Sequence, residues 1–394
     1  MKLLWVKTDF LHPTTRGGQI RTLELLRQLR RRHEIHYVAF NDPKEPEGVK
    51  RASEYCSKAY PIEHHVGDKS SPAFLGELIA GLVSRLPVAV RRYRSADMRH
   101  QIERLISQEH FDCVVCDFLA PSPNIPELTS CVLFQHNVEA VIWNRRTEHA
   151  PDPLRRFYLK LQADRMFRYE SHVCRKVRKI IAVSEADATL MRDSYGVKKA
   201  EAVATGVDAD YFKARDPASA CADLVFVGSM DWSPNIDGIE WFEREVLPSI
   251  LRRKPECTVA IVGRKPPRAI RELAVRHPCV QVTGTVPDVR PWLWGSKVSI
   301  VPLRVGGGTR LKIFEAMAAG IPVVSTTIGA EGLGARDGDT IRIADAPEDF
   351  ATACIALLDD AAERERLSDR ALRMVTEQYS WEAVAAAFEK LLIA

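Results

Sequence analysis

Three charged residues near the C-terminal end of the chain have the types and spacing of an anion-binding site. Arg310, Lys312 and Glu315 follow three glycines at 306–308. On a helix, Lys312 and Glu315 project about 60° apart, away from the apolar side. Two cations at a helix N-terminus suit phosphates, and a carboxylate one turn later suits paired hydroxyl groups, so a nucleoside diphosphate would satisfy both. The alternative is a solvated Lys–Glu pair on a surface helix.

The elements that position these residues follow from the local sequence. An apolar run at 298–303 predicts a buried strand, and the glycines after it allow bare backbone to approach a ligand. Thr309 is a suitable N-cap for a helix through residue 319, which Gly320 ends. A further strand is predicted at 322–324. The core face of the helix is predicted to consist of Ile313, Phe314, Met317 and Ala318.

One run resembles the donor-binding signature of the retaining glycosyltransferases of family 4, which have the GT-B fold: residues 310–324, RLKIFEAMAAGIPVV. The resemblance implies that Glu315 binds the ribose hydroxyls and that Arg310 and Lys312 bind the diphosphate. Many members carry a second glutamate eight residues upstream, where this chain has Gly307. Backbone N–H groups are expected to contact the donor there instead. The donor-binding residues expected in this loop are Gly307, Gly308 and Thr309.

The resemblance also assigns residues outside this motif. Gly17 and Gly18 separate the first predicted strand from the first helix and match the N-terminal glycine loop near the donor diphosphate. Gly228 and Ser229 follow a predicted strand at a point where many relatives carry an arginine and then a lysine. Because this chain lacks both there, the phosphate charge is expected to fall on the cations at 310 and 312. Val286 lies in a loop that contacts the nucleobase through its backbone in the family.

His136 follows a predicted strand at 132–135, and the carboxyl end of a parallel strand is where α/β sheets place ligands. It matches a position where family 4 enzymes often carry a histidine close to the C6 hydroxyl of the sugar. We expect His136, together with Arg310 and Lys312, to act in the catalytic step. The alternative is a structural histidine that caps a helix.

Length and composition indicate a globular protein of two domains. The chain has 394 residues, 46% of them hydrophobic. No stretch approaches about 18 apolar residues, and the first ten residues resemble a strand more than a signal peptide. Among the nine cysteines, Cys113 and Cys116 have metal-site spacing, but their side chains would point to opposite faces of a strand. A reduced, cytoplasmic protein is expected.

Charge is unevenly distributed along the chain. Residues 1–200 hold 33 Lys and Arg against 24 Asp and Glu, a balance of +9, and residues 201–394 have a balance of −5. A basic segment predicted as one long helix over 145–180 concentrates the positive charge. The basic first half indicates either a phosphorylated acceptor or an acidic membrane surface, or else charges that are scattered over a solvated surface. The segment 145–180 is either an element in peripheral contact with the inner face of a membrane or a surface helix packed on its own sheet. Nucleic acid is not expected, because no recognised binding motif accompanies the charge.

The succession of strands and helices, read with the resemblance, predicts an α/β protein of GT-B architecture: two facing doubly wound Rossmann-like domains with an interdomain cleft. The acceptor-side domain is expected over 1–205 and the donor-binding domain over 206–378, with a helix at 379–394 crossing back onto the first. Asp-x-Asp triplets at 208–210 and 337–339 are expected to be structural. No metal and no cofactor is therefore predicted.

The implied function is metal-independent transfer of a hexose from a UDP- or GDP-type nucleotide sugar to an acceptor hydroxyl, with retention at the anomeric carbon. The acceptor would be a glycan, a lipid-linked or a small molecule, in polysaccharide, glycolipid or other glycoconjugate biosynthesis. Two alternatives stay open: a sugar-nucleotide epimerase of the same fold, and a catalytically silent scaffold that binds nucleotide sugars. Gly307 in place of a glutamate favours the scaffold, whereas His136 favours the transferase.

Overall fold

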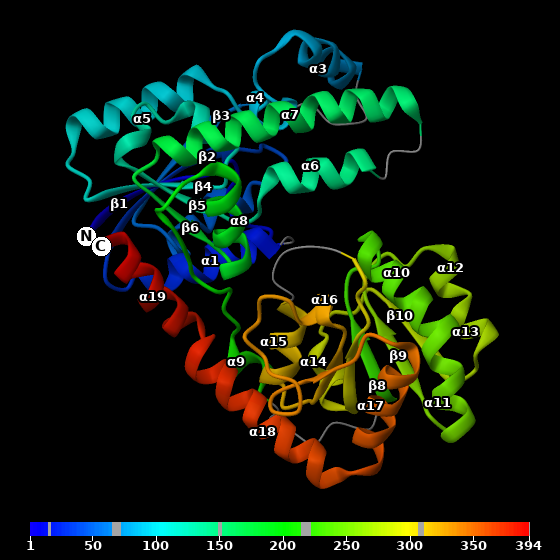
Figure 1. Ribbon diagram of the computed structural model, residues 1–394. Helices are drawn as coiled ribbons and strands as arrows, with labels where there is room; N and C mark the ends of the chain where they lie inside the picture. The colour runs from blue at the N-terminus through cyan, green and yellow to red at the C-terminus, as the bar shows by residue number, and fades with distance from the viewer. Residues whose placement is uncertain (15–16, 65–71, 149–151, 214–221, 306–310, 394) are drawn as a thin grey trace. The chain divides into compact units, whose positions relative to one another are not determined.

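The computed structural model describes residues 1–14, 17–64, 72–148, 152–213, 222–305 and 311–393. The chain divides into two units, each built on a parallel sheet with helices on both faces (Figure 1). Unit 1 comprises Met1–Ala204 and Val384–Ala394, and unit 2 comprises Thr205–Ala383. The predicted doubly wound α/β class is confirmed, and the predicted cleft between the units stays a prediction.

Unit 1 has a seven-stranded sheet in the order β3-β2-β1-β4-β5-β6-β7 among the described residues. Its strands are β1 (Lys2–Val6), β2 (Glu34–Asn41), β3 (Lys58–Glu63), β4 (Cys113–Asp117), β5 (Cys131–Gln135), β6 (Lys179–Ala182) and β7 (Ala200–Ala202). Its helices are α1 (Gly17–Leu29), α2 (Glu47–Lys50), α3 (Pro72–Val83), α4 (Val88–Arg91), α5 (Ala96–Gln108), α6 (Glu139–Glu148), α7 (Pro153–Lys176), α8 (Glu185–Tyr195) and the part of α19 (Trp381–Ile393) from Val384 on. Short 3₁₀ turns are η1 (Ala52–Glu54), η2 (Ser122–Asn124) and η3 (Leu128–Ser130).

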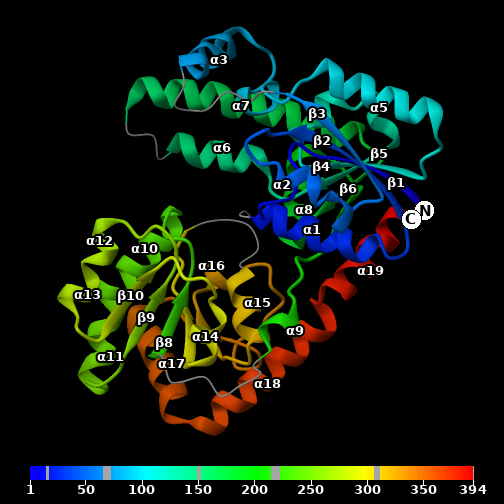
Figure 2. The ribbon, with the colours of Figure 1, turned by 180° about the vertical axis from the view of Figure 1, so that it is seen from behind.

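The central strands of unit 1, β1, β4 and β5, are almost entirely buried because helices cover both faces of the sheet. Figures 1 and 2 show α1 and α19 along one face and α5 and α7 along the other. Phe388 of α19 packs on Trp5 and Phe134, with ring centroids 5.8 and 4.9 Å away. In the parallel register Val6 pairs with Cys116, so the next residues, Lys7 and Asp117, are neighbours at the carboxyl ends of β1 and β4.

The basic segment predicted as one helix over 145–180 is interrupted, and that prediction is wrong. Helices α6 and α7 run side by side (Figures 1 and 2), and α7 begins only at Pro153. The Asp152 carboxylate caps it by accepting a hydrogen bond from the Arg155 backbone N–H, 2.7 Å away. Proline at the first helical position and aspartate before it are start signals, and they override a charge pattern that continues across the break.

Unit 2 has a six-stranded sheet in the order β10-β9-β8-β11-β12-β13 among the described residues. Its strands are β8 (Ala222–Val227), β9 (Val259–Val262), β10 (Val280–Gly284), β11 (Ser296–Val301), β12 (Val323–Ser325) and β13 (Arg342–Ile343). Its helices are α9 (Ala209–Phe212), α10 (Ser233–Trp241), α11 (Leu247–Arg253), α12 (Arg268–Arg271), α13 (Leu273–Arg276), α14 (Arg290–Trp294), α15 (Leu311–Ala318), α16 (Thr327–Ala330), α17 (Pro347–Asp359) and α18 (Ala361–Gln378). A π-helical turn, η4 (Phe242–Val246), joins α10 to α11.

Helix α15 is the element predicted most fully from the sequence. Its predicted core face is confirmed, since Ile313, Phe314, Met317 and Ala318 are all buried. The strand before it is displaced from the prediction: β11 covers Ser296–Val301 instead of 298–303. In both sheets the strand order reverses beside the first strand, between β1 and β4 in unit 1 and between β8 and β11 in unit 2. Doubly wound sheets bind ligands at the carboxyl ends of such strands.

Candidate active site

In unit 2 the reversal between β8 and β11 brings a lysine onto a glycine. A Cβ atom placed on Gly228, just after β8, would lie 2.5 Å from Nζ of Lys312 on α15. The Lys312 ammonium donates a hydrogen bond to Oδ1 of Asn235 at 2.7 Å and lies over the ring of Phe226, 4.2 Å from its centroid. The structure thus brings together Gly228 and Lys312, both predicted to bind the donor. The N–H of Gly228 donates to the Val262 carbonyl at 2.9 Å, so this glycine contributes space and not a donor.

Glu315 lies one turn after Lys312 on α15 and keeps partial contact with solvent. None of the described residues donates a hydrogen bond to its carboxylate. Burial raises the pKa of Glu315, and the charge of Lys312 partly opposes that rise. A carboxylate with no protein donor, beside a lysine, can accept hydrogen bonds from a ligand's hydroxyl groups.

The loops after β8 and β9 add a cation that the sequence analysis did not assign. Nε of Arg264, which follows β9, donates to the Ser229 hydroxyl at 2.6 Å. A Cβ on Gly263 would lie 1.8 Å from the Gly228 carbonyl oxygen, so glycine is required there for the two loops to touch. Val286, in the loop after β10, is half-buried against the apolar core of the unit. Its predicted contact with a nucleobase stays a prediction.

Four of the predicted donor-binding residues lie outside the residues that the structure describes. They are Gly307, Gly308, Thr309 and Arg310. Their contacts with the donor diphosphate and sugar therefore stay predictions.

In unit 1 the corresponding edge of the sheet holds a buried charge network centred on Asp117. Its carboxylate is 3.0 Å from Nζ of Lys7 and accepts hydrogen bonds from Nε1 of Trp5 at 3.0 Å and Oγ1 of Thr22 at 2.7 Å. Burial alone would raise the pKa of this carboxyl, but Lys7 and His136 outweigh it and hold the pKa below its usual range. Asp117 is therefore ionised and fully committed to protein partners.

His136 occupies the other side of this network. Its Nε2 is 2.7 Å from Oδ1 of Asp117, and its Nδ1 is 3.0 Å from a guanidinium nitrogen of Arg21. Burial, helped by Arg21 and Lys7, lowers the pKa of His136 to about 3, so the ring is neutral. Because arginine can only donate, Nδ1 accepts from Arg21 and Nε2–H donates to Asp117. Both ring nitrogens are thus engaged within the protein, and a contact with the transferred sugar stays a prediction.

The predicted glycine pair at the start of α1 has two different environments. A Cβ on Gly18 would lie 2.7 Å from the ring of Phe118, whereas nothing lies within 4 Å of one on Gly17. Phe118 itself has a positive φ of 71° and stacks on His136 with centroids 3.8 Å apart. Strained backbone of this kind persists where its surroundings hold it, often at functional sites. Gly18 therefore serves close packing, while Gly17 leaves its backbone open.

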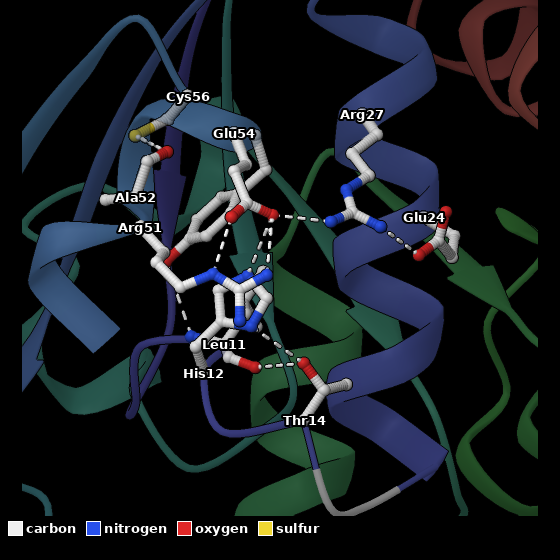
Figure 3. Close-up of polar contacts among 10 residues, drawn as sticks. Leu11, His12, Thr14, Glu24, Arg27, Arg51, Ala52, Glu54 and Cys56 are labelled. Atoms are coloured by element: carbon white, nitrogen blue, oxygen red, sulfur yellow. Dashed lines mark hydrogen bonds and ion pairs between the residues drawn. The ribbon is translucent and has the colours of Figure 1, made fainter. Parts of the chain in front are cut away.

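The described part of the segment after β1, through residue 14, is held by an ion cluster (Figure 3). Nε2 of His12 lies 3.2 Å from the Glu54 carboxylate, which also pairs with Arg27 of α1 and with Arg51. Hydrogen bonds from the two arginines outweigh partial burial and lower the pKa of Glu54 to about 2. The Thr14 hydroxyl closes the loop by donating to the backbone carbonyl of residue 11 at 2.7 Å. The cluster ties His12 to η1 through Glu54, and ties Glu54 to the last turn of α1 through Arg27.

A pocket of about 310 Å³ lies beside the Asp117 network, at the carboxyl ends of β1 and β4. Its lining includes polar residues from three separate parts of unit 1 and apolar residues from two more. These are Lys7, Asp9, Gln19, Phe118, Glu139 and Met166. None of them is among the site residues predicted from the sequence. The available signal was that Lys7 is the last residue of a strand predicted over 2–7 and that Glu139 follows the strand predicted over 132–135, but only the sheet order shows that those strand ends meet.

The Asp-x-Asp triplets have structural partners. The Asp208 carboxylate caps α9 by accepting from the Tyr211 N–H at 2.8 Å, and Asp337 accepts from the Ile343 N–H at 2.8 Å. Asp339 forms an ion pair with Arg370. These contacts give Asp208, Asp337 and Asp339 partners within the protein, and the absence of a metal at the triplets stays a prediction.

Within the described residues, one group has the composition of a metal site: Glu34, His36 and Glu109. Lys2 forms an ion pair with Glu109, and Lys58 lies 3.7 Å from Glu34. The group stands at the amino ends of β1 and β2, opposite the edge that carries the pocket. Two ammonium groups pair with its carboxylates, and His36 is buried beneath them, so the contacts within the protein account for the charges of this group.

Comparison with known proteins gives the family and the fold. The model described as Glycosyltransferase Family 4 matches residues 15–211, and the one described as Glycosyl transferases group 1 matches residues 221–360. The glycogen synthase of Mycobacterium tuberculosis is 27% identical over 239 residues, which are 57% of this chain and 56% of that protein. The chain spans about half the length of the curated relatives that it matches.

Solved structures of similar shape cover nearly the whole chain. Sucrose-phosphate synthase from Thermosynechococcus elongatus matches with a TM-score of 0.73 at 15% identity, over 99% of this chain and 98% of that one. HepE from Anabaena in complex with UDP matches with a TM-score of 0.70 at 12% identity, over 100% of both chains. At these identities the likeness shows the GT-B fold. Because the first family model covers half of the chain, the protein belongs to glycosyltransferase family 4.

Proposed function

We propose that the protein is a retaining hexosyltransferase that uses a nucleotide sugar as donor. The observation that carries this proposal is the pairing on α15 of the Lys312 ammonium, seated against Gly228, with the Glu315 carboxylate, which has no donor among the described residues. The Lys312 ammonium suits a diphosphate, and the Glu315 carboxylate suits the hydroxyl groups of a ribose. Both lie at the strand reversal where such folds bind nucleotides. HepE, of the same fold, has been solved with UDP and with UDP-glucose, which favours a UDP-sugar as the first donor to try.

In the proposed reaction the bond between the anomeric carbon and the diphosphate oxygen breaks, and a bond from the acceptor oxygen forms on the same face. The leaving diphosphate gains negative charge and takes the proton of the acceptor hydroxyl, so this chain need not supply a base. Lys312 and Arg310 would stabilise that charge without a metal ion. His136, held neutral between Asp117 and Arg21, would keep the sugar-facing edge of unit 1 in place.

The experiment that tests this proposal omits the acceptor. UDP-glucose, UDP-N-acetylglucosamine and GDP-mannose are each incubated with the protein, with and without excess EDTA, and the products are followed by proton NMR. A retaining transferase releases free sugar slowly, first as the anomer present in the donor, and EDTA leaves the rate unchanged. A new sugar isomer still attached to the nucleotide would indicate the epimerase, and binding with no product would indicate the scaffold. Loss of activity on chelation, with rescue by Mg²⁺, would refute metal independence.

We also propose a peripheral contact with an acidic membrane, through α3 and α7. Among the described residues no helix is both long and apolar enough to cross a bilayer. Large apolar side chains nevertheless stand exposed on these helices: Leu154 and Phe157 are 80% and 67% exposed, and Val83 is 86% exposed. Nε2 of Gln162 on α7 donates to the Gly81 carbonyl at 3.1 Å, which holds the two helices together.

Exposed basic residues accompany this apolar surface on α7 and on the neighbouring helix α6, as expected for an interfacial element. They are Arg155, Arg156 and Lys160 of α7, and Arg145 and Arg146 of α6. Vesicles that contain phosphatidylglycerol should bind the protein at low salt and release it at high salt, whereas phosphatidylcholine vesicles should bind little. The double variant Leu154→Ser with Phe157→Ser should lose this binding. Val275→Ser, at an equally exposed apolar position in unit 2, is the control. Equal binding to both kinds of vesicle, or to neither, would refute the contact.

A further inference from the structure

We propose that the pocket of unit 1 binds the acceptor as an uncharged, polyhydroxylated ring, and that Asp9 and Glu139 exclude an anionic group from it. The inference rests on the proposed transferase function, because it names the substrate class of the second substrate. It concerns residues that are separate from the donor-binding motif on α15.

The position of the pocket fits a substrate site. It lies where the strand order of unit 1 reverses, between β1 and β4, which is the ligand position of doubly wound sheets. Phe118, the residue with strained backbone, forms part of its wall, and the open backbone of Gly17 is next to the lining residue Gly18. At about 310 Å³ the pocket is at the small end of ligand sites, which suits one ring and not an extended chain.

Lys7 is the one cation among the described lining residues, and its charge is already balanced. Its side chain is 1% exposed, and its ammonium lies 3.0 Å from the Asp117 carboxylate. That approach lacks hydrogen-bond geometry, so the buried ammonium is left without a hydrogen-bond acceptor in the protein. A buried donor of this kind is costly unless a ligand satisfies it. A hydroxyl oxygen satisfies it without bringing further charge.

Glu139 brings an uncompensated carboxylate to the other side of the pocket. The buried carboxylate of Glu170, on α7, accepts the N–H groups of Glu139 and Ala140 at 3.0 and 2.8 Å and so fixes the start of α6. None of the described residues donates a hydrogen bond to the side-chain carboxylate of Glu139. Burial and the neighbouring charge of Glu170 raise the pKa of Glu139 to about 7, against a smaller opposing effect of Arg146. The carboxylate therefore faces the pocket with acceptor capacity to spare.

Asp9 adds a second carboxylate whose hydrogen-bond donors, among the described residues, are neutral. It accepts hydrogen bonds from Nε2 of Gln19 at 2.9 Å and from the Thr8 hydroxyl at 3.2 Å. These bonds orient the carboxylate without adding a positive charge beside it. Two carboxylates with no ion-pair partner in the described part of the chain repel phosphate and carboxylate groups, whereas hydroxyl groups can donate to both. Apolar lining from Phe118 and Met166 suits the C–H face of a sugar ring.

The charge of the pocket is opposite to what the basic first half of the chain suggests. The exposed arginines of α6 and α7 give unit 1 its positive balance, but none of them lines the pocket. If the acceptor carries a phosphate, as a lipid-linked acceptor does, that phosphate must lie outside this pocket. The ring that receives the sugar is neutral.

The experiment compares pairs of probes that differ at C6 alone, where one carries a hydroxymethyl group and the other a carboxylate. Methyl glucoside, galactoside and mannoside are each paired with the methyl glycoside of the corresponding uronic acid, and binding to the full chain with UDP is measured by saturation-transfer NMR at pH 8. At least one neutral glycoside should bind. The Kd of its uronic acid should be higher by a factor of about ten or more. Glu139→Gln and Asp9→Asn should each narrow that ratio. Glu148→Gln, an exposed glutamate at the far end of α6, should leave it unchanged.

Calorimetry with UDP separates this inference from the proposed function. If UDP does not bind, the donor assignment on α15 fails. If UDP binds and a uronic acid binds as tightly as its neutral partner, or none of the three neutral glycosides binds, the acceptor inference is overturned while the donor site stands. The inference would also be overturned if Glu148→Gln lowered the ratio of the two Kd values as much as Glu139→Gln does. The preference for a neutral ring would then come from the total charge of the protein and not from the pocket.

Discussion

The two sheets carry charge at equivalent edges in contrasting ways. At the reversal in unit 1, Asp117 is buried with Lys7, His136, Thr22 and Trp5 around it, so the charges satisfy one another. At the reversal in unit 2, the Glu315 carboxylate has no donor among the described residues, and Lys312 stands against a glycine. The charges of unit 1 hold the side chains beside the pocket in place. In unit 2 the Glu315 carboxylate can still accept hydrogen bonds from a ligand.

This difference predicts where substitutions will act. Removing one member of a buried ion pair leaves the other charge uncompensated, which costs about 3–5 kcal/mol of stability. Removing a partly exposed group that a ligand uses costs affinity or rate and little stability. Variants in unit 1 should therefore change both stability and catalysis, whereas variants of α15 should change binding and catalysis alone.

The largest effect is expected at Lys312. Lys312→Met removes the ammonium group that we propose binds the donor diphosphate. The value of kcat/KM should therefore fall about 10²- to 10³-fold, as for the loss of one transition-state contact. The melting temperature should hardly change. Lys297→Met is the control, since Lys297 is 55% exposed and pairs with Asp223 at the amino end of β8. A kcat/KM within a few-fold of the wild type would remove Lys312 from the site.

His136→Ala should come next and should show the mixed behaviour of unit 1. We expect kcat to fall about 10²-fold with UDP affinity nearly unchanged, because the substitution disturbs the wall and not the nucleotide site. Stability should also fall, by about 1–3 kcal/mol, because Asp117 loses a buried hydrogen bond. His277→Ala removes a histidine bonded to Glu243 in unit 2 and should leave kcat unchanged. Loss of stability in His136→Ala with wild-type kcat would make His136 purely structural.

Glu315→Ala tests the other half of the comparison. Loss of the ribose contacts should weaken UDP binding by about 1–3 kcal/mol in calorimetry, with no change in melting temperature. Glu365→Ala, at an exposed position on α18, is the matched control. Unchanged affinity for UDP would place Glu315 outside the ribose site and would undo the assignment of α15.

The same contrast explains how far the sequence could be interpreted. The site of unit 2 is mostly contiguous, so helical periodicity sufficed to place Lys312 and Glu315 opposite the apolar face that the structure shows buried. Even there, Asn235 as the partner of Lys312 was missed, because it comes from a helix far away in the sequence. No local pattern links Lys312 to that residue.

The pocket of unit 1 could not be derived in this way. Lys7, Asp117 and Glu139 become neighbours only because β1 pairs with β4 and β4 with β5, and a single sequence does not specify that strand order. Continuous hydrophobic runs predicted the central strands, because both faces of those strands are covered. The same runs lack the alternation of apolar and polar residues that would have indicated register. His136 was found through family resemblance, and its partners Asp117 and Arg21 were not.

The smallest effect is expected for the pH dependence of stability in a variant of Glu139. It tests directly whether the Glu139 carboxylate lines the proposed acceptor pocket. In the folded protein its pKa is raised from 4.5 to about 7. The folded state therefore binds this proton more tightly than the unfolded state does. The stability that this contributes is complete below about pH 4.5 and is lost as the pH rises through about 7.

Glutamine imitates the protonated side chain at every pH, so Glu139→Gln should match the wild type at pH 4.5 and exceed it at pH 8. The gain should be about 1 kcal/mol, because the side chain keeps some contact with solvent. Other groups titrate in this range, including His136, whose lowered pKa makes stability rise with pH between about 3 and 6.5. They are common to both proteins, so the difference between the two unfolding midpoints isolates Glu139. Equal midpoints at pH 8 would mean that the carboxylate is fully solvated, and solvent would then screen its repulsion of an anionic group in the pocket.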